Sequence, residues 1–136
     1  MNRLFIDTNI ILDLLGERKP FYDSAAKLAT LADLKNITLI ASPLSFTIVE
    51  YILCKYESHL VVMNKLRKFK IICEVCEVNE ETIEKSLNSS FKDFEDAVQY
   101  YAAIQANCNI ILTRNGKDFK NSKLPVMTVE EYLATI

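Results

Sequence analysis

The chain has 136 residues, half of them hydrophobic and a quarter charged, which suits one domain that buries its own core. Its formal net charge of −2 argues against a protein whose whole surface binds nucleic acid, although it allows a local basic patch. No window approaches the roughly 18 apolar residues of a membrane helix, and the first residues, MNRLFID, do not resemble a signal peptide. We therefore expect a single domain over residues 1–136 that is cytoplasmic and makes no membrane contact.

A short buried strand is predicted at residues 3–6, where the sequence RLFI is mostly apolar. The apolar residues within 10–15 then have helical spacing, and this helix is expected to end near Gly16. Thr8 or Asn9 is the expected N-cap, because hydroxyl and amide side chains satisfy the free amides of a first turn. The chain thus begins with a strand followed directly by a helix.

The rest of the chain continues to alternate between helical and strand-like patterns. Helices are predicted over 21–34, 43–56, 58–69, 79–89, 92–107 and 129–136, and strands over 37–43, 71–78, 109–113 and 125–128. Short apolar strands separated by helices are typical of a parallel sheet covered on both faces. We predict an α/β fold, a three-layer sandwich in which helices flank a central, mainly parallel sheet of four or five strands.

The four cysteines, found without a secretion signal, indicate reduced thiols rather than a disulfide framework. Cys73 and Cys76 have the spacing of half a zinc site, but Cys54 and Cys108 stand apart and His59 is the only histidine. Because ICEVCEV also has the composition of a strand, a structural role is the favoured interpretation.

Carboxylates follow two of the predicted strands. Asp7 comes directly after residues 3–6, and Asp118 lies in the loop TRNGKDF, which begins at Thr113. Ligands of open α/β sheets bind outside the carboxyl ends of the strands, so both acids are expected at one edge of the sheet. An unpaired carboxylate is costly to bury, so Asp7 is expected either to cap a helix or to bind a ligand.

Two predicted helices carry further acids. Glu50 is the only carboxylate in the apolar segment SPLSFTIVEYILC, where it either faces a site or lies on a narrow polar stripe. Asp93, Glu95 and Asp96 open another helix, where acids commonly complement the helix dipole. Asp93 and Asp96 share a helical face that continues inward, so one of them is expected to point into the fold.

Several of these acids are able to meet at the same edge of the sheet: Asp7, Glu50, Asp96 and Asp118. Crowded carboxylates repel one another unless a cation lies among them, and oxygen ligands suit Mg²⁺ or Mn²⁺. The chemistry implied is metal-assisted attack of water on a phosphodiester. A histidine-based mechanism is disfavoured because no histidine lies in these segments, and two glycines are too few for a nucleotide-binding loop.

The segments FIDTNIILDLL, SFTIVEYIL, FEDAVQYYAA and ILTRNGKDF, in this order, resemble the PIN domain family and in particular its small bacterial VapC-like members. The resemblance covers essentially the whole chain. It implies an Mg²⁺- or Mn²⁺-dependent ribonuclease, an antitoxin protein as partner, and a homodimer.

Carried over residue by residue, the resemblance implies three metal-binding and catalytic acids, with a fourth position at Asp118 or replaced by Asn115. The three acids are Asp7, Glu50 and Asp96. Residues that match supporting positions of the family are Thr8, Asn9 and Thr113. Family members often have an aspartate where this chain has Asn115, which bears on whether one metal or two are bound. Asp93 is an additional acid near the site.

Our first hypothesis is therefore an endoribonuclease, the toxin-like component of a toxin–antitoxin pair, with RNA phosphates contacted by Arg114, Lys117 and Lys120. The alternative is a PIN-like module that no longer cleaves and instead binds RNA or protein. A phosphatase with an aspartate nucleophile ranks low, because Asn9 stands where a second aspartate would be expected.

Overall fold

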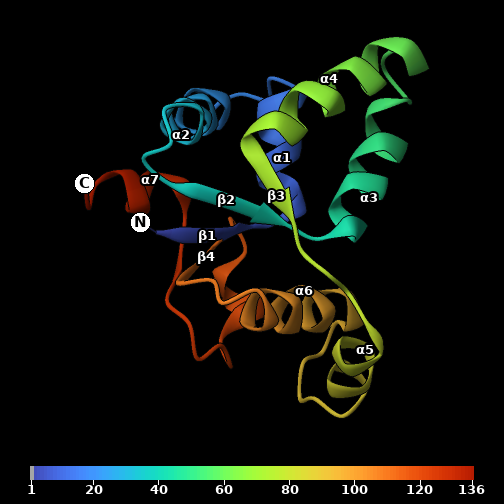
Figure 1. The fold of residues 1–136 in the computed structure, drawn as a ribbon, viewed down its shortest axis with the longest axis vertical. Coiled ribbons are helices and arrows are strands. Elements are labelled where there is room, and N and C mark those ends of the chain that lie inside the picture. The colour runs from blue at the N-terminus through green and yellow to red at the C-terminus, as the bar shows by residue number, and fades with distance from the viewer. Residues whose placement is uncertain (1) are drawn as a thin grey trace.

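The structure is a computed structural model that describes residues 2–136, and Figure 1 shows three layers, with helices above and below a sheet. The strands are β1 (Arg3–Ile6), β2 (Thr38–Ala41), β3 (Cys73–Val75), β4 (Ile110–Leu112) and β5 (Val126–Met127). The helices are α1 (Thr8–Leu15), α2 (Tyr22–Asp33), α3 (Pro43–Leu53), α4 (His59–Ile72), α5 (Glu80–Leu87), α6 (Phe94–Gln105) and α7 (Val129–Leu133), with a 3₁₀ turn η1 (Gly116–Phe119).

All the paired strands run parallel, in the order β3-β2-β1-β4-β5. Phe5 lies opposite Ile40 on one side and opposite Ile111 on the other. Along the chain, β2 and then β3 are added on one side of β1, and β4 and then β5 are added on its other side. This confirms the predicted α/β sandwich, and it places the point where strand order reverses between β1 and β4.

Alternate residues of each strand face opposite layers. Leu4 and Ile6 of β1 pack into the larger core, which α1 to α4 cover, whereas Phe5 between them packs toward α6. Helix α4 continues through Ile72, so the strand predicted over 71–78 is reduced to Cys73–Val75. None of the helices formed within residues 2–136 is long and apolar enough to cross a membrane.

The cysteines are free thiols, as expected from the sequence. Burial raises the pKa of Cys73 to about 12 and that of Cys76 to about 11. Both thiols are therefore protonated at neutral pH, which agrees with the structural role favoured for them.

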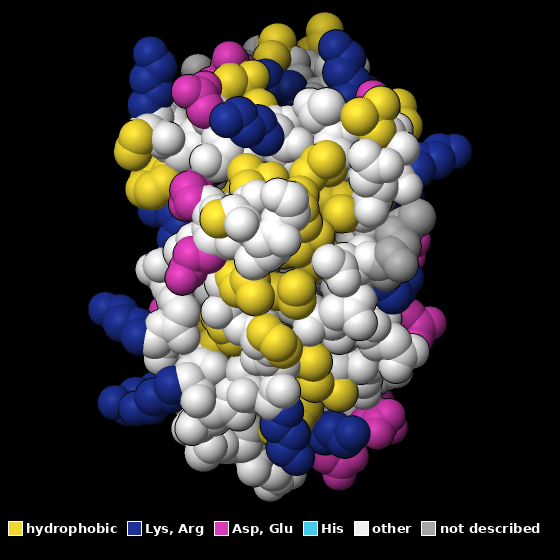
Figure 2. Space-filling model, turned by 90° about the vertical axis from the view of Figure 1, so that its left-hand side faces the viewer, with side chains coloured by type: hydrophobic (Ala, Val, Ile, Leu, Met, Phe, Trp, Pro, Cys, Tyr) yellow, Lys and Arg dark blue, Asp and Glu magenta, His cyan; other side chains and the backbone are white. Residues whose placement is uncertain are grey.

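The edge at which the strands begin differs in character from the edge at which they end. Figure 2 presents that beginning edge, on the left of Figure 1, and a band of hydrophobic side chains crosses its middle. Lysine and arginine side chains project from the margins of this face, and acidic ones are scattered over it. The acids that were expected to gather lie at the opposite edge of the sheet, after β1 and β4.

A buried amide on α6 ties three helices together beneath that edge. Gln99 is fully buried; its Oε1 accepts a hydrogen bond from Ser42 Oγ at 2.8 Å. Its Nε2 donates to Ser45 Oγ at 3.1 Å and to Thr8 Oγ1 at 3.4 Å. The hydroxyls of Thr8 and Ser45 are themselves 2.8 Å apart. Gln99 thereby fixes the separation of α1, α3 and α6.

We predict that Gln99→Leu lowers the free energy of unfolding by about 1–3 kcal/mol, because it leaves buried hydroxyls without their amide partner. Gln105→Leu is the matched control on the same helix, since it removes one side-chain hydrogen bond, from Thr82 Oγ1 to Gln105 Oε1, and Gln105 Nε2 has no partner among the described residues. Urea denaturation of both variants measures the difference. Equal losses would show that the Gln99 network contributes nothing specific.

Candidate active site

Asp7 is locked in one orientation at the end of β1. Its backbone N–H donates to the Leu112 carbonyl of β4 at 3.1 Å. Its carboxylate accepts from the Thr8 backbone N–H at 2.8 Å and from Thr113 Oγ1 at 2.9 Å. Asp7 is thus itself the N-cap of α1, and the expectation that Thr8 or Asn9 caps this helix is wrong. Asp7 both caps α1 and takes part in the site, because its Oδ1 accepts the bond from the Thr8 backbone and its Oδ2 accepts the bond from Thr113.

Thr113 connects Asp7 to the loop that follows β4. Besides donating to Asp7, its hydroxyl accepts a hydrogen bond from the Asn115 backbone N–H at 3.0 Å. The Asn115 carbonyl in turn accepts from the Asp118 backbone N–H at 2.9 Å. This chain of bonds sets the 3₁₀ turn η1, and with it Asp118, close to the end of β1.

The first turn of α6 brings two more acids to the same place. Asp93 is the N-cap of α6 and accepts from the Glu95 backbone N–H at 3.3 Å. Asp96 lies one turn further along and is partly buried, with Gln99 of the buried network a further turn behind it. Asp96 is therefore the inward-facing acid of this pair, as the spacing predicts, and Asp93 is the cap.

The acids raise one another's pKa, which shows that they lie within electrostatic reach. Burial and the charges of Asp93, Asp7 and Asp118 raise the pKa of Asp96 to about 7. Burial also raises the pKa of Asp7, although the hydrogen bonds from Thr113 and Thr8 oppose this. Burial, with Asp93 and Asp7, raises the pKa of Glu95 as well. Asp7, Asp93, Asp96 and Asp118 form what we call the acidic cluster.

An open cleft of about 490 Å³ adjoins the acidic cluster. Its lining includes three acids, Asp93, Asp96 and Asp118, and three lysines, Lys92, Lys117 and Lys120. Lys117 and Lys120, the lysines predicted to contact RNA, are exposed at this cleft. The cleft thus combines carboxylates with exposed lysines, a combination that suits a phosphate chain beside a metal ion.

Arg114 does not have the role expected for it. Its guanidinium donates through Nε to Asp13 Oδ2 at 2.9 Å and through Nη2 to Asp13 Oδ1 at 3.1 Å, and it lies over the ring of Phe21. Asp13 is buried and also pairs with Arg18, which donates to the side chain of Asn9 at 3.2 Å. A bidentate pair with a buried carboxylate makes Arg114 a structural clamp for the loop after β4, not a free cation for RNA.

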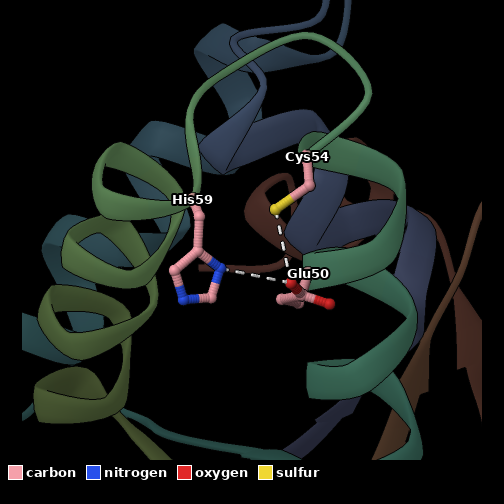
Figure 3. Close-up of side chains that lie close together, drawn as sticks. All are labelled: Glu50, Cys54 and His59. Carbon is pink, nitrogen blue, oxygen red and sulfur yellow. Dashed lines mark hydrogen bonds and ion pairs between the residues drawn. The ribbon is translucent and has the colours of Figure 1, made fainter.

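Glu50 also lies outside the acidic cluster. Figure 3 shows it on the side of α3 that faces α4, where its carboxylate accepts a hydrogen bond from Cys54 Sγ at 3.3 Å and lies 3.7 Å from His59 Nδ1. Partial burial and the bond to Glu50 raise the pKa of the Cys54 thiol. Val49, the residue before Glu50, packs fully into the core instead. The structure therefore does not bring Glu50 together with Asp7 and Asp96.

Two residues that support the site were not identified from the sequence. Asp13 is a lone acid in an apolar helix, which is the same signal that drew attention to Glu50, and it could have been found in that way. Gln99 carries no comparable signal, because a glutamine on a partly polar helix is ordinary. Both hold elements in place, and neither belongs to the acidic cluster.

The acidic cluster offers only oxygen ligands, the kind that a hard divalent cation prefers. Burial and the charges of neighbouring carboxylates raise the pKa of Asp96, and a cation would offset the part that is due to those charges. Thr113 keeps one Asp7 oxygen aligned toward the loop after β4. Asp7, Asp96 and Asp118 thus offer the donor atoms that suit a Mg²⁺- or Mn²⁺-type ion, although their oxygens do not all lie within 4.8 Å of one another among the described residues.

Comparisons with known proteins agree with the fold. Ribonuclease VapC1 of Aquifex aeolicus (strain VF5) is 27% identical over 135 residues, which cover 96% of this chain and 92% of that protein. A chain in the crystal structure of VapBC2 from Rickettsia felis, bound to a DNA fragment from their promoter, superposes with a TM-score of 0.68 at 19% identity, covering 92% of this chain and 96% of that chain. A chain of a toxin–antitoxin complex from Klebsiella pneumoniae gives a TM-score of 0.67 at 23% identity, covering 93% of this chain and 97% of that chain.

The model of the PIN domain family matches residues 3–117, a stretch that contains β1 to β4 and the acidic cluster apart from Asp118. The two solved structures share the same fold across more than nine-tenths of this chain. This protein belongs to the PIN domain family.

Proposed function

We propose that this PIN domain protein is a divalent-metal-dependent endoribonuclease and the toxin-like component of a toxin–antitoxin pair. The observation that carries the proposal is the acidic cluster beside a cleft bordered by lysines. The relative from Aquifex aeolicus named as a ribonuclease supports the choice of RNA as substrate.

Asp7, Asp96 and Asp118 would hold the metal ion, which when bound supplies a more acidic water and charge neutralisation at the phosphodiester. Thr113 and the Thr8 amide keep Asp7 in a fixed orientation, so that its carboxylate does not reorganise when the ion binds. Lys117 and Lys120, which line the cleft, would bind RNA phosphates along it.

The proposed antitoxin partner rests on the relatives. One of the superposed chains comes from a toxin–antitoxin complex and another from a VapBC assembly bound to promoter DNA. A protein that covers the lysine-bordered cleft would block access of RNA to the acidic cluster. A homodimer, expected from the family resemblance, stays a prediction.

We predict that the purified protein cleaves RNA with Mg²⁺ or Mn²⁺ and that EDTA abolishes cleavage. Asp7→Asn and Asp96→Asn are each expected to lower the cleavage rate at least about a hundredfold, since loss of a ligand costs more than the ten- to hundredfold typical of outer-shell partners. Denaturing gel electrophoresis of a mixed RNA pool measures the rate.

Asp93→Asn is the matched control on the same helix turn, because asparagine also caps a helix and Asp93 is exposed, whereas Asp96 is partly buried. It should keep most of the metal affinity. Cleavage that survives EDTA would contradict the metal mechanism, while metal binding without cleavage of any RNA would favour a binding module instead.

Glu50→Gln tests the geometry against the family motif. Because Glu50 faces α4 and not the acidic cluster, we expect this variant to cleave RNA within about threefold of the wild-type rate. The same gel assay applies. A loss as large as that of Asp96→Asn would show that α3 turns toward the cleft during the reaction.

The raised pKa of Asp96 predicts a pH dependence of stability in the metal-free protein. The folded state favours protonated Asp96, so this group makes folding less favourable as pH rises from its ordinary pKa of 3.8 to about 7. Asp96→Asn removes this loss. In EDTA, the variant should therefore gain stability relative to the wild type between pH 5 and pH 8, as measured by urea denaturation.

Saturating Mg²⁺ should reverse the order of stability at pH 8, because the ion binds the folded wild type more tightly than the variant. A difference between the two proteins that does not change with pH would mean that burial and the other acids do not raise the pKa of Asp96.

A further inference from the structure

Three side chains of different chemistry meet where α3 gives way to α4. Glu50 and Cys54 are four residues apart and therefore project from the same side of the last turn of α3. His59 is the first residue of α4, and Figure 3 shows its ring turned toward the other two. One ligand atom from each residue lies within 4.8 Å of those from the other two.

The distances within this group are close to those around a tetrahedral zinc ion. Zinc–sulfur bonds of about 2.3 Å and zinc–nitrogen or zinc–oxygen bonds of about 2.0 Å place a sulfur and an oxygen ligand about 3.5 Å apart, and a nitrogen and an oxygen about 3.3 Å apart. Cys54 Sγ is 3.3 Å from Glu50 Oε2, and His59 Nδ1 is 3.7 Å from the same oxygen. These two distances are within a few tenths of an ångström of the tetrahedral values, and all three ligand atoms lie within 4.8 Å of one another.

The ligand types point away from magnesium and toward a borderline or soft ion. A thiolate, an imidazole and a carboxylate are each common zinc ligands, whereas magnesium and calcium take oxygen. We propose that Glu50, Cys54 and His59 bind a Zn²⁺ ion, with the fourth position left to water. This site is separate from the acidic cluster and does not depend on the proposed nuclease function.

Two of the three side chains are open to solvent. The His59 side chain is 74% exposed and that of Glu50 37% exposed, so an ion reaches both from solvent. His59 is the one ion-pair partner of Glu50 within residues 2–136. An exposed pair of this kind stabilises the fold little by itself, so replacing it with metal bonds has little to overcome.

A bound ion would clip the end of α3 to the start of α4 across the short connection between them. Glu50 also lines a mostly apolar groove of about 530 Å³ between these helices, together with Phe46, Met63 and Leu66. The ion would therefore fix one end of that groove.

Cobalt(II) in place of zinc tests the site, because a Cys thiolate bound to Co²⁺ gives a near-ultraviolet charge-transfer band that oxygen ligands do not give. We expect the full-length, reduced, metal-free protein to develop this band with one Co²⁺ per chain, and Zn²⁺ to displace it. Cys54→Ser should abolish the band, and His59→Gln should weaken Co²⁺ binding at least about tenfold.

Matched controls separate this site from the rest of the molecule. Cys76→Ser removes another partly buried thiol and should keep the band, as should Asp7→Asn, which alters only the acidic cluster. Absence of the band in the wild type, or its persistence in Cys54→Ser, would overturn the proposal.

Alkylation gives a second measurement that does not depend on variants. With Zn²⁺ present, Cys54 should react with iodoacetamide at least about tenfold more slowly, whereas Cys76 should react at an unchanged rate, as mapped by mass spectrometry. Equal rates for Cys54 with and without Zn²⁺ would also overturn the proposal.

Discussion

The hydrogen bond from the Thr113 hydroxyl to the Asp7 carboxylate joins the ends of β1 and β4, and the geometry of the site depends on it. It forms because β1 and β4 pair in parallel with Ile6 opposite Leu112, so that the next residue of each strand lies beside the other. A slip of one residue would reverse the facing of every side chain in β1 and break this alignment. The register that packs the core is therefore the same register that assembles the site.

The acidic cluster is an unfavourable arrangement that the rest of the fold sustains. Burial, together with the charges of carboxylates from β1, α6 and the loop after β4, raises the pKa of Asp96 to about 7. The hydrogen bonds of Gln99 hold α6 against α1 and α3, and the Asp13–Arg114 ion pair holds the loop after β4 against α1. Stabilising contacts thus surround carboxylates that repel one another, an arrangement expected at a cation-binding site.

The sequence was sufficient to predict the sandwich, the sheet edge and the acids at strand ends, because parallel strands bring their carboxyl ends together whatever the details of packing. It was not sufficient for acids within apolar helices. Glu50 and Asp13 give the same pattern, yet Asp13 is buried against two arginines and Glu50 faces α4. What separates them is the rotation of each helix about its axis, and the sequence around one acid does not determine that rotation.

The rotation of helix α3 about its axis points two of its polar side chains in different directions. Ser45 and Glu50 are five residues apart, which turns them about 140° from each other around the helix axis. Ser45 faces inward to Thr8 and Gln99, behind the acidic cluster, while Glu50 faces outward to Cys54 and His59. Oxygen ligands therefore gather on one side of α3 and a mixed set of sulfur, nitrogen and oxygen on the other. Because the two sets share no side chain, an ion at either site leaves the ligands of the other site in place.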